Sequence, residues 1–126
     1  MTMKYVLTDT TKVVEGHTLY QIKAVSAFGD VAIGDLGGWI ESEKNLSQEG
    51  NAWIYDDAKV FNNARIFGNA KIYDNALIFG NAGVYDNAEV HDYVWVFGTA
   101  QICGTAQILS NAQISGDILI WRLNEM

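Results

Sequence analysis

The 126-residue sequence contains no proline and only one cysteine, Cys103. A single cysteine excludes an internal disulfide and a cysteine-rich zinc site, so we expect a reducing, cytoplasmic location. No apolar run approaches the roughly 18 residues of a membrane span. The N-terminus also lacks the long apolar segment of a secretory signal. The sequence therefore predicts a protein that is neither inserted into a membrane nor secreted.

Positive charge is also scarce, with eight lysines and arginines against fifteen aspartates and glutamates and a net charge of −7. A protein that binds nucleic acid or an anionic membrane needs a basic face. We therefore expect neither as a partner. The acidic balance favours either a protein partner with a basic surface or simply solubility.

What the sequence does contain is a six-residue repeat, which runs through twelve consecutive hexads from Asn51 onward. The second place is alanine in ten hexads, with Val94 and Ile118 as the exceptions. The first place is mostly asparagine, and the sixth is Gly, Asp, Asn or Ser except at Arg122. The fourth place is always aliphatic: Ile54, Val60, Ile66, Ile72, Ile78, Val84, Val90, Val96, Ile102, Ile108, Ile114 and Ile120.

This pattern indicates short strands separated by regular corners. Alternate residues of a strand point the same way, so alanine and the aliphatic residue face inward together. Gly, Asp and Asn tolerate the backbone angles of tight turns. Because the chain turns the same way after every hexad, it must coil rather than form hairpins. No helical stripe of apolar residues competes with this interpretation.

The repeat over residues 51–121 resembles the left-handed parallel β-helix of hexapeptide-repeat proteins. In that family three hexads make one triangular coil of 18 residues. The chain departs from the family's enzymes in the residue after the aliphatic place, which is usually small or acidic there and is mostly aromatic here. We predict an all-β fold: a left-handed parallel β-helix, triangular, with 18 residues per coil.

Residues 1–50 follow a different pattern, and we expect them to form an N-terminal β-hairpin and an irregular cap coil within a single domain. The segments KYVLTD and TLYQIKAV alternate like paired strands. A β-helix end exposes strand edges and an open core, so it needs a cap. We expect the turn at Gly37, Gly38 and Trp39 to provide a plug, and residues 51–126 to form the β-helix. The N-terminal half also resembles small hypothetical proteins of phages and prophages.

With 18 residues per coil, residues n and n+18 stack about 4.8 Å apart. One face then carries five outward apolar side chains: Phe61, Leu77, Phe79, Trp95 and Phe97. Such a patch is typical of an interface, although stacked rings also stabilise a ladder by themselves. We expect a second copy as the partner, with a dimer favoured and a trimer left open.

One corner stacks Asp56, Asp74 and Asp92, with His91 beside the column. Aspartate is a common turn residue, so solvated turns are the simplest explanation of the column. A hard-cation site is a further alternative, although calcium prefers six or more oxygens. We assign this acidic corner to a partner that carries a basic surface.

The resemblance implies an enzyme alternative, because hexapeptide acyltransferases are trimers that use a histidine base between neighbouring prisms. His17 lies outside the repeat, His91 replaces an aromatic surface residue, and no loop interrupts the twelve hexads to enclose a substrate. Cys103 has no neighbouring base to activate it. The sequence therefore predicts no catalytic residue, no metal, no cofactor and no enzymatic activity.

The function predicted from the sequence is a non-catalytic protein-binding module. The phage resemblance suggests a phage-encoded inhibitor of a host defence protein, such as an anti-CRISPR or a similar counter-defence factor. Three alternatives remain: an acyltransferase-like trimer, a sponge for a small nucleotide signal held between subunits, and a structural assembly unit.

Overall fold

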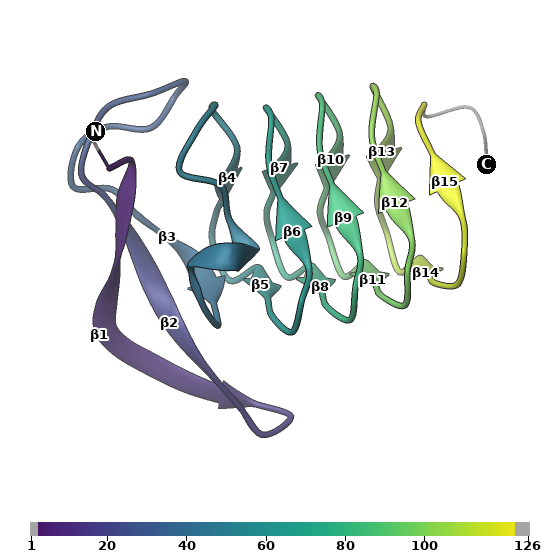
Figure 1. Cartoon of the computed structure of the whole chain (residues 1–126), viewed down its shortest axis with the longest axis horizontal. Coiled ribbons are helices and arrows are strands. Elements are labelled where there is room, and N and C mark those ends of the chain that lie inside the picture. Colours follow the sequence, from purple (N-terminus) through teal and green to yellow (C-terminus); the bar gives the residue numbers. More distant parts are fainter. Residues whose placement is uncertain (1–2, 123–126) are drawn as a thin grey trace.

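The computed structural model describes residues 3–122. A long antiparallel hairpin comes first, formed by β1 (Tyr5–Val14) and β2 (His17–Ala24). The next strand, β3 (Leu36–Ile40), pairs antiparallel with β2 and parallel with β5 (Lys59–Val60). Because β3 belongs to both pairings, it joins the hairpin to the coils (Figure 1). The short 3-10 helix η1 (Glu43–Asn45) follows β3. Within residues 3–122, no helix has the length and apolar character needed to cross a membrane.

The coils consist of β3 and a series of two-residue strands, arranged in three parallel sheets. The first is β3-β5-β8-β11-β14, extended by the hairpin; the second is β4-β7-β10-β13 and the third β6-β9-β12-β15. The strands are β4 (Trp53–Ile54), β6 (Arg65–Ile66), β7 (Lys71–Ile72), β8 (Leu77–Ile78), β9 (Gly83–Val84), β10 (Glu89–Val90), β11 (Trp95–Val96), β12 (Gln101–Ile102), β13 (Gln107–Ile108), β14 (Gln113–Ile114) and β15 (Leu119–Ile120).

The register confirms the predicted left-handed β-helix with 18 residues per coil, since Leu77 pairs with Trp95 and Trp95 with Gln113. Residues 123–126 of the predicted repeat segment lie outside the described residues. The corners need left-handed backbone, which Asp, Asn and Gly adopt most readily. At Gly80, for example, φ is +68°, and an added Cβ would lie 2.9 Å from the amide nitrogen of Gly98.

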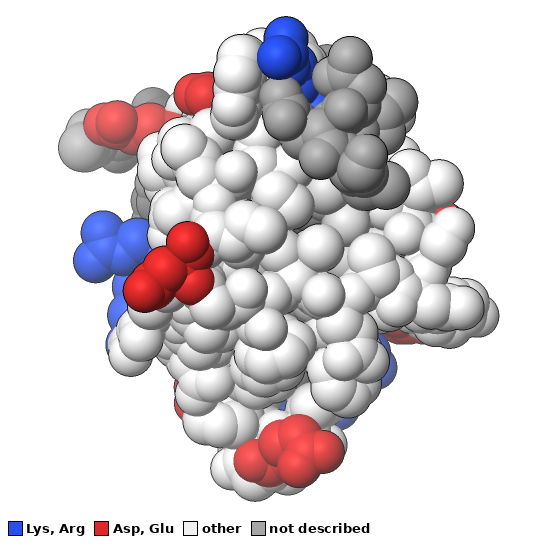
Figure 2. Space-filling view, turned by 90° about the vertical axis from the view of Figure 1, so that its right-hand side faces the viewer, with Lys and Arg blue, Asp and Glu red and all other residues white. Residues whose placement is uncertain are grey.

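The core runs along the axis of the prism and consists of the repeated alanine and aliphatic residues. Ile78 and Val96 have no exposed surface. Burial falls in the last coil, where Ile114 is half-buried and Ile118 is 42% exposed. Figure 2 views this end of the β-helix and shows a mostly uncharged surface with both acidic and basic groups towards its rim.

The opposite end of the core is closed by Tyr5, Phe28 and Trp53. The ring of Trp53 lies edge-on to both others, with centroid distances of 6.2 Å to Tyr5 and 5.2 Å to Phe28. The predicted plug at Trp39 is wrong, because Trp39 lies in β3 and packs with Leu19 and Phe61 on the outer face.

Lys4 completes this cap by donating hydrogen bonds to carbonyl groups of the first coil. Its Nζ lies 2.8 Å from the carbonyl oxygen of Ala52 and 3.4 Å from that of Gly50. Only 4% of the residue is exposed. Burial disfavours the charged amine and lowers the pKa of Lys4 to about 8.

This lowered pKa predicts that the protein gains stability as the pH rises. The pKa of Lys4 is about 8 when folded and 10.5 when unfolded, so the unfolded chain binds more protons between these values. The free energy of unfolding should therefore increase from about pH 8 to about pH 10, by about 1–2 kcal/mol. Urea denaturation at each pH measures this increase, and Lys4→Met should remove it. An increase that persists in Lys4→Met would assign the effect to another group.

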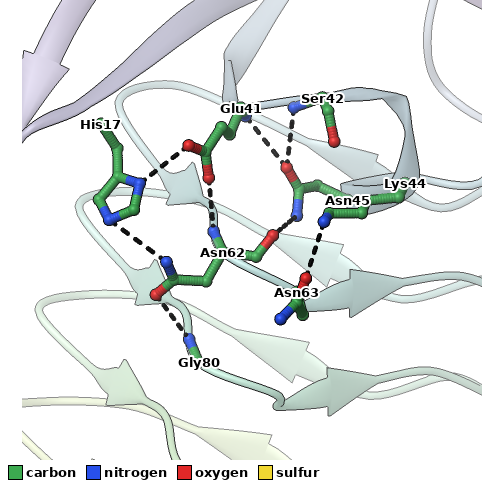
Figure 3. A network of polar contacts seen from close by, with 8 residues as sticks. All are labelled: His17, Glu41, Ser42, Lys44, Asn45, Asn62, Asn63 and Gly80. Carbon is green, nitrogen blue, oxygen red and sulfur yellow. Dashed lines mark hydrogen bonds and ion pairs between the residues drawn. The ribbon is translucent and has the colours of Figure 1, made fainter.

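A polar network fixes the hairpin to a corner of the coils (Figure 3). Nδ1 of His17 donates to Oε2 of Glu41 at 2.8 Å, and the amide nitrogen of Asn62 donates to the other oxygen of Glu41 at 2.9 Å. Nδ2 of Asn62 lies 3.2 Å from Nε2 of His17. Partial burial alone would raise the pKa of Glu41, but the hydrogen bonds from His17 and Asn62 outweigh it and lower that pKa. Both ring nitrogens of His17 thus have a structural partner.

Candidate functional site

The other histidine, His91, lies directly after β10, where the chain leaves the second sheet for the next corner. Its ring stacks on the ring of Tyr73 with centroids 4.5 Å apart and planes within 3°. Tyr55, one coil earlier, meets Tyr73 edge-on at 6.3 Å. The 18-residue spacing of the three residues creates this column, which holds the imidazole in one orientation. The side chain of His91 is 18% exposed.

Two aspartates of the acidic corner face Nδ1 of His91. Nδ1 of His91 lies 2.9 Å from Oδ1 of Asp92 and 3.6 Å from Oδ2 of Asp74. The amide of Ser110 and the hydrogen bond from His91 lower the pKa of Asp92, so its carboxylate stays ionised. An ionised acceptor places the proton on Nδ1 and leaves the lone pair on Nε2. Within residues 3–122, Nε2 of His91 has no hydrogen-bond partner.

A shallow hollow of about 270 Å³ adjoins this column. Its lining residues are Asp30, Tyr55, Asp56, Lys71, Tyr73 and Glu89. The hydroxyl groups of Tyr55 and Tyr73 donate to Asp30 at 2.8 Å and to Glu89 at 3.0 Å. Burial and the bond to Glu89 raise the pKa of Tyr73 to about 12, so its hydroxyl remains a donor at neutral pH. Three carboxylates against one lysine favour a cationic ligand in this hollow.

The aspartates of the acidic corner also hold neighbouring coils together. Asp56, Asp74 and Asp92 adopt left-handed backbone with φ of 57°, 58° and 62°. In each of them Oδ2 accepts the backbone amide one coil later, from Asp74 at 3.2 Å, Asp92 at 3.1 Å and Ser110 at 2.7 Å. Ligand atoms of Asp74, His91 and Asp92 lie within 4.8 Å of one another, an arrangement compatible with a divalent cation. The assignment of this corner to a basic partner stays a prediction.

The predicted apolar patch is smaller than expected. Phe61, Phe79 and Phe97 stack as predicted, with centroids 5.2 Å and 5.0 Å apart. However, the expectation that Phe61 faces solvent is wrong: it is 3% exposed, because the hairpin covers it with Leu19. The four remaining members stay at the surface, with Trp95 41% exposed. Their role as an interface stays a prediction.

The hollow beside Tyr73 was not predicted from the sequence. The 18-residue spacing puts Tyr73 and Glu89 on the same face as His91, but Asp30 belongs to the loop between β2 and β3. No periodicity places that loop, so no sequence signal could have brought Asp30 to Tyr55. Cys103 is buried, with 8% of its surface exposed, and it is not one of the residues that line the hollow.

No protein-family model matches the chain. A protein of Escherichia coli (strain K12) named "Uncharacterized acetyltransferase YdcK" is 60% identical to this chain over 38 residues. The match covers 30% of the chain and 12% of the relative, so the chain spans only a small part of that protein's length.

This match corrects the prediction that the chain is not an enzyme, because the similar protein is named an acetyltransferase. The resemblance of the N-terminal half to phage proteins gains no support from the comparisons. Together, the match and the 18-residue register identify the chain as a β-helix repeat protein that shares a segment with an acetyltransferase.

Proposed function

We propose that the protein is an acyltransferase that moves an acetyl group from a thioester to an amine, with His91 as the general base. The observation that carries this proposal is the His91–Asp92 pair: Nε2 of His91 has no hydrogen-bond partner among residues 3–122, and the ring stacks on Tyr73, which lines an acidic hollow. The segment shared with a protein named an acetyltransferase supports the reaction class.

The geometry suits proton transfer during amide formation. As the amine nitrogen attacks the thioester carbonyl, Nε2 of His91 accepts the proton from that nitrogen. The carbon–sulfur bond then breaks, and the departing thiolate accepts this proton from Nε2. Asp92, ionised and 2.9 Å from Nδ1, stabilises the imidazolium that exists between the two steps.

The hollow next to His91 favours an amine as the acceptor. Asp30, Asp56 and Glu89 line it and attract a cationic group. Tyr73 lies between the hollow and His91, since it lines the one and stacks on the other. An acceptor with two amino groups, held here by one protonated ammonium group, would therefore present its second, neutral amine to the imidazole along the Tyr73 ring.

The direct test is to incubate the purified chain with acetyl-coenzyme A and a panel of amines that includes a polyamine, a lysine-containing peptide and an amino sugar. Release of free thiol, followed with a thiol reagent, should exceed the buffer rate for at least one amine. Release at the buffer rate with every amine would overturn the proposal.

A second copy of the chain would complete this site. Trp95 and His91 lie on opposite sides of the corner at Asp92 and Tyr93, so a copy seated on Trp95 would border the open side of the site. Trimers with sites between subunits are what the hexapeptide-repeat resemblance implies. Burial of the patch at about 25 cal/mol per Å² is worth several kcal/mol before association costs.

We expect Trp95→Glu to convert an oligomer into a folded monomer, because it places a charge in the patch without touching the core. Light scattering coupled to size exclusion, at tens of micromolar, measures the mass. Leu119→Glu is the matched control, since Leu119 is an exposed apolar residue of β15 in the third sheet, away from the patch. A wild-type monomer, or a Trp95→Glu variant that stays oligomeric, would contradict this interface.

The phage-encoded inhibitor that we expected from the sequence is supported by neither the fold nor the comparison. A protein partner with a basic surface and a cytoplasmic location stay predictions. The acidic corner is compatible with both that partner and the amine acceptor proposed above.

A further inference from the structure

A groove on the third sheet gathers two cations in this acidic chain. Lys44 of η1 and Arg65 of β6 both line two neighbouring hollows of about 430 and 480 Å³, and Glu43 also lines the larger one. Nζ of Lys44 donates to Oδ1 of Asn63 at 2.7 Å. Arg65 is exposed and has no hydrogen bond or ion pair among residues 3–122. Two cations against one carboxylate in the same groove favour an anionic ligand.

The same groove offers an open aromatic face. Phe67 stacks on Tyr85, one coil later, with centroids 4.7 Å apart and planes within 6°. On the other side of the Phe67 ring, the pairing departs from the 18-residue register. Here Leu46 pairs with Ile66, and the amide of Ser47 donates to the carbonyl of Ile66. Ser47 therefore lies opposite Phe67, where a regular coil would place another large side chain. Phe67 is accordingly 40% exposed and borders the larger hollow.

We infer that this groove binds a nucleoside phosphate, with the base stacked on the open face of Phe67 and the phosphate held by Arg65 and Lys44. The base would extend the Phe67–Tyr85 column by one ring. The carboxamides of Asn81 and Gln101 line the adjoining hollow and can bond to the sugar. The groove lies on a different face from His91, so this inference does not depend on the proposed acyl transfer.

The base and the phosphate of the ligand should each contribute to its affinity. Stacking of a base on an aromatic side chain changes affinity by about 10- to 100-fold. The contact between arginine and phosphate is electrostatic, so it should weaken as salt is added. Adenosine, which lacks the phosphate, and inorganic phosphate, which lacks the ring, should therefore each bind at least about tenfold more weakly than adenosine monophosphate.

Isothermal titration calorimetry with adenosine monophosphate, adenosine, inorganic phosphate and coenzyme A tests the inference. Arg65→Gln should weaken the binding of adenosine monophosphate at least about tenfold and leave the binding of adenosine unchanged. Phe67→Leu should weaken the binding of both compounds. Lys23→Gln, which removes one exposed positive charge from the hairpin, is the control and should bind like the wild type. Both substitutions lie at surface positions, and circular dichroism checks that the variants are folded.

Each outcome bears on the inference. No heat with adenosine monophosphate at millimolar concentration, or binding that Arg65→Gln and Phe67→Leu leave unchanged, would overturn it. Coenzyme A also carries an adenine nucleotide. If it binds much more tightly than adenosine monophosphate and loses that affinity in Arg65→Gln, the groove serves the acyl donor; equal affinities indicate a free nucleotide. Neither result depends on measured acetyl transfer, so failure of one proposal is distinguishable from failure of the other.

Discussion

In the His91→Gln variant we expect kcat/KM for acetyl transfer to fall about 10²- to 10⁴-fold, the usual contribution of a positioned general base. Glutamine can bond to Asp92 but cannot take a proton from the attacking amine. The fold should persist, because His91 lies on the outer side of the strand and the core residue Val90 is unchanged. Thiol release at several amine concentrations separates the effect on kcat from that on KM.

Asp92→Asn distinguishes a positioning role from a structural one. Asparagine tolerates the left-handed backbone of this corner, where φ is 62°, and retains an oxygen for the amide of Ser110. Loss of the charge should slow transfer about 10- to 100-fold, while the melting temperature changes little. Tyr93→Phe, at a neighbouring exposed position, should behave like the wild type.

His17→Gln tests the other histidine of the chain. Both ring nitrogens of His17 have partners in the network of Figure 3, so this variant should lose stability and retain activity when folded. Activity that falls in His17→Gln and survives in His91→Gln would contradict the assignment of His91 and move the site to the hairpin.

Ile78→Asp should abolish folding altogether. Ile78 has no exposed surface and lies between Val60 and Val96 in the first sheet, so a carboxylate there would have no water and no partner. An unpaired buried charge costs several kcal/mol or more, and the lost apolar contacts add to that. The sum approaches the whole stability of a small domain, about 5–15 kcal/mol.

Circular dichroism and thermal melting of Ile78→Asp measure this outcome. The matched control is Gln107→Asp, which introduces the same side chain at an exposed strand position and should melt like the wild type. A cooperative, wild-type melting curve for Ile78→Asp would contradict the packing of the core. Loss of folding in both variants would indicate that acidic charge in general, rather than burial, destabilises the coils.

The coils could be predicted from the sequence because each contact within them repeats the spacing of the chain. A hexad that always turns the same way brings residue n against residue n+18. The stacking of His91 on Tyr73 and of Phe79 on Phe97 therefore follows from counting. The inward aliphatic places are decided in the same way, because side chains alternate along a strand.

The contacts of residues 3–50 with the coils were decided only by the tertiary structure. Phe61 is covered by Leu19, Asp30 reaches Tyr55, and Ser47 rather than a ring faces Phe67. None of these pairs shares the 18-residue spacing, so each depends on how the hairpin and cap fold back over the prism. The repeat by itself thus determined a columnar β-helix and the position of His91 on its surface. The non-repetitive residues 3–50 decide which columns of the β-helix stay open to a ligand. Burial of a column depends on how these residues pack against the coils, and the two segments share no common period.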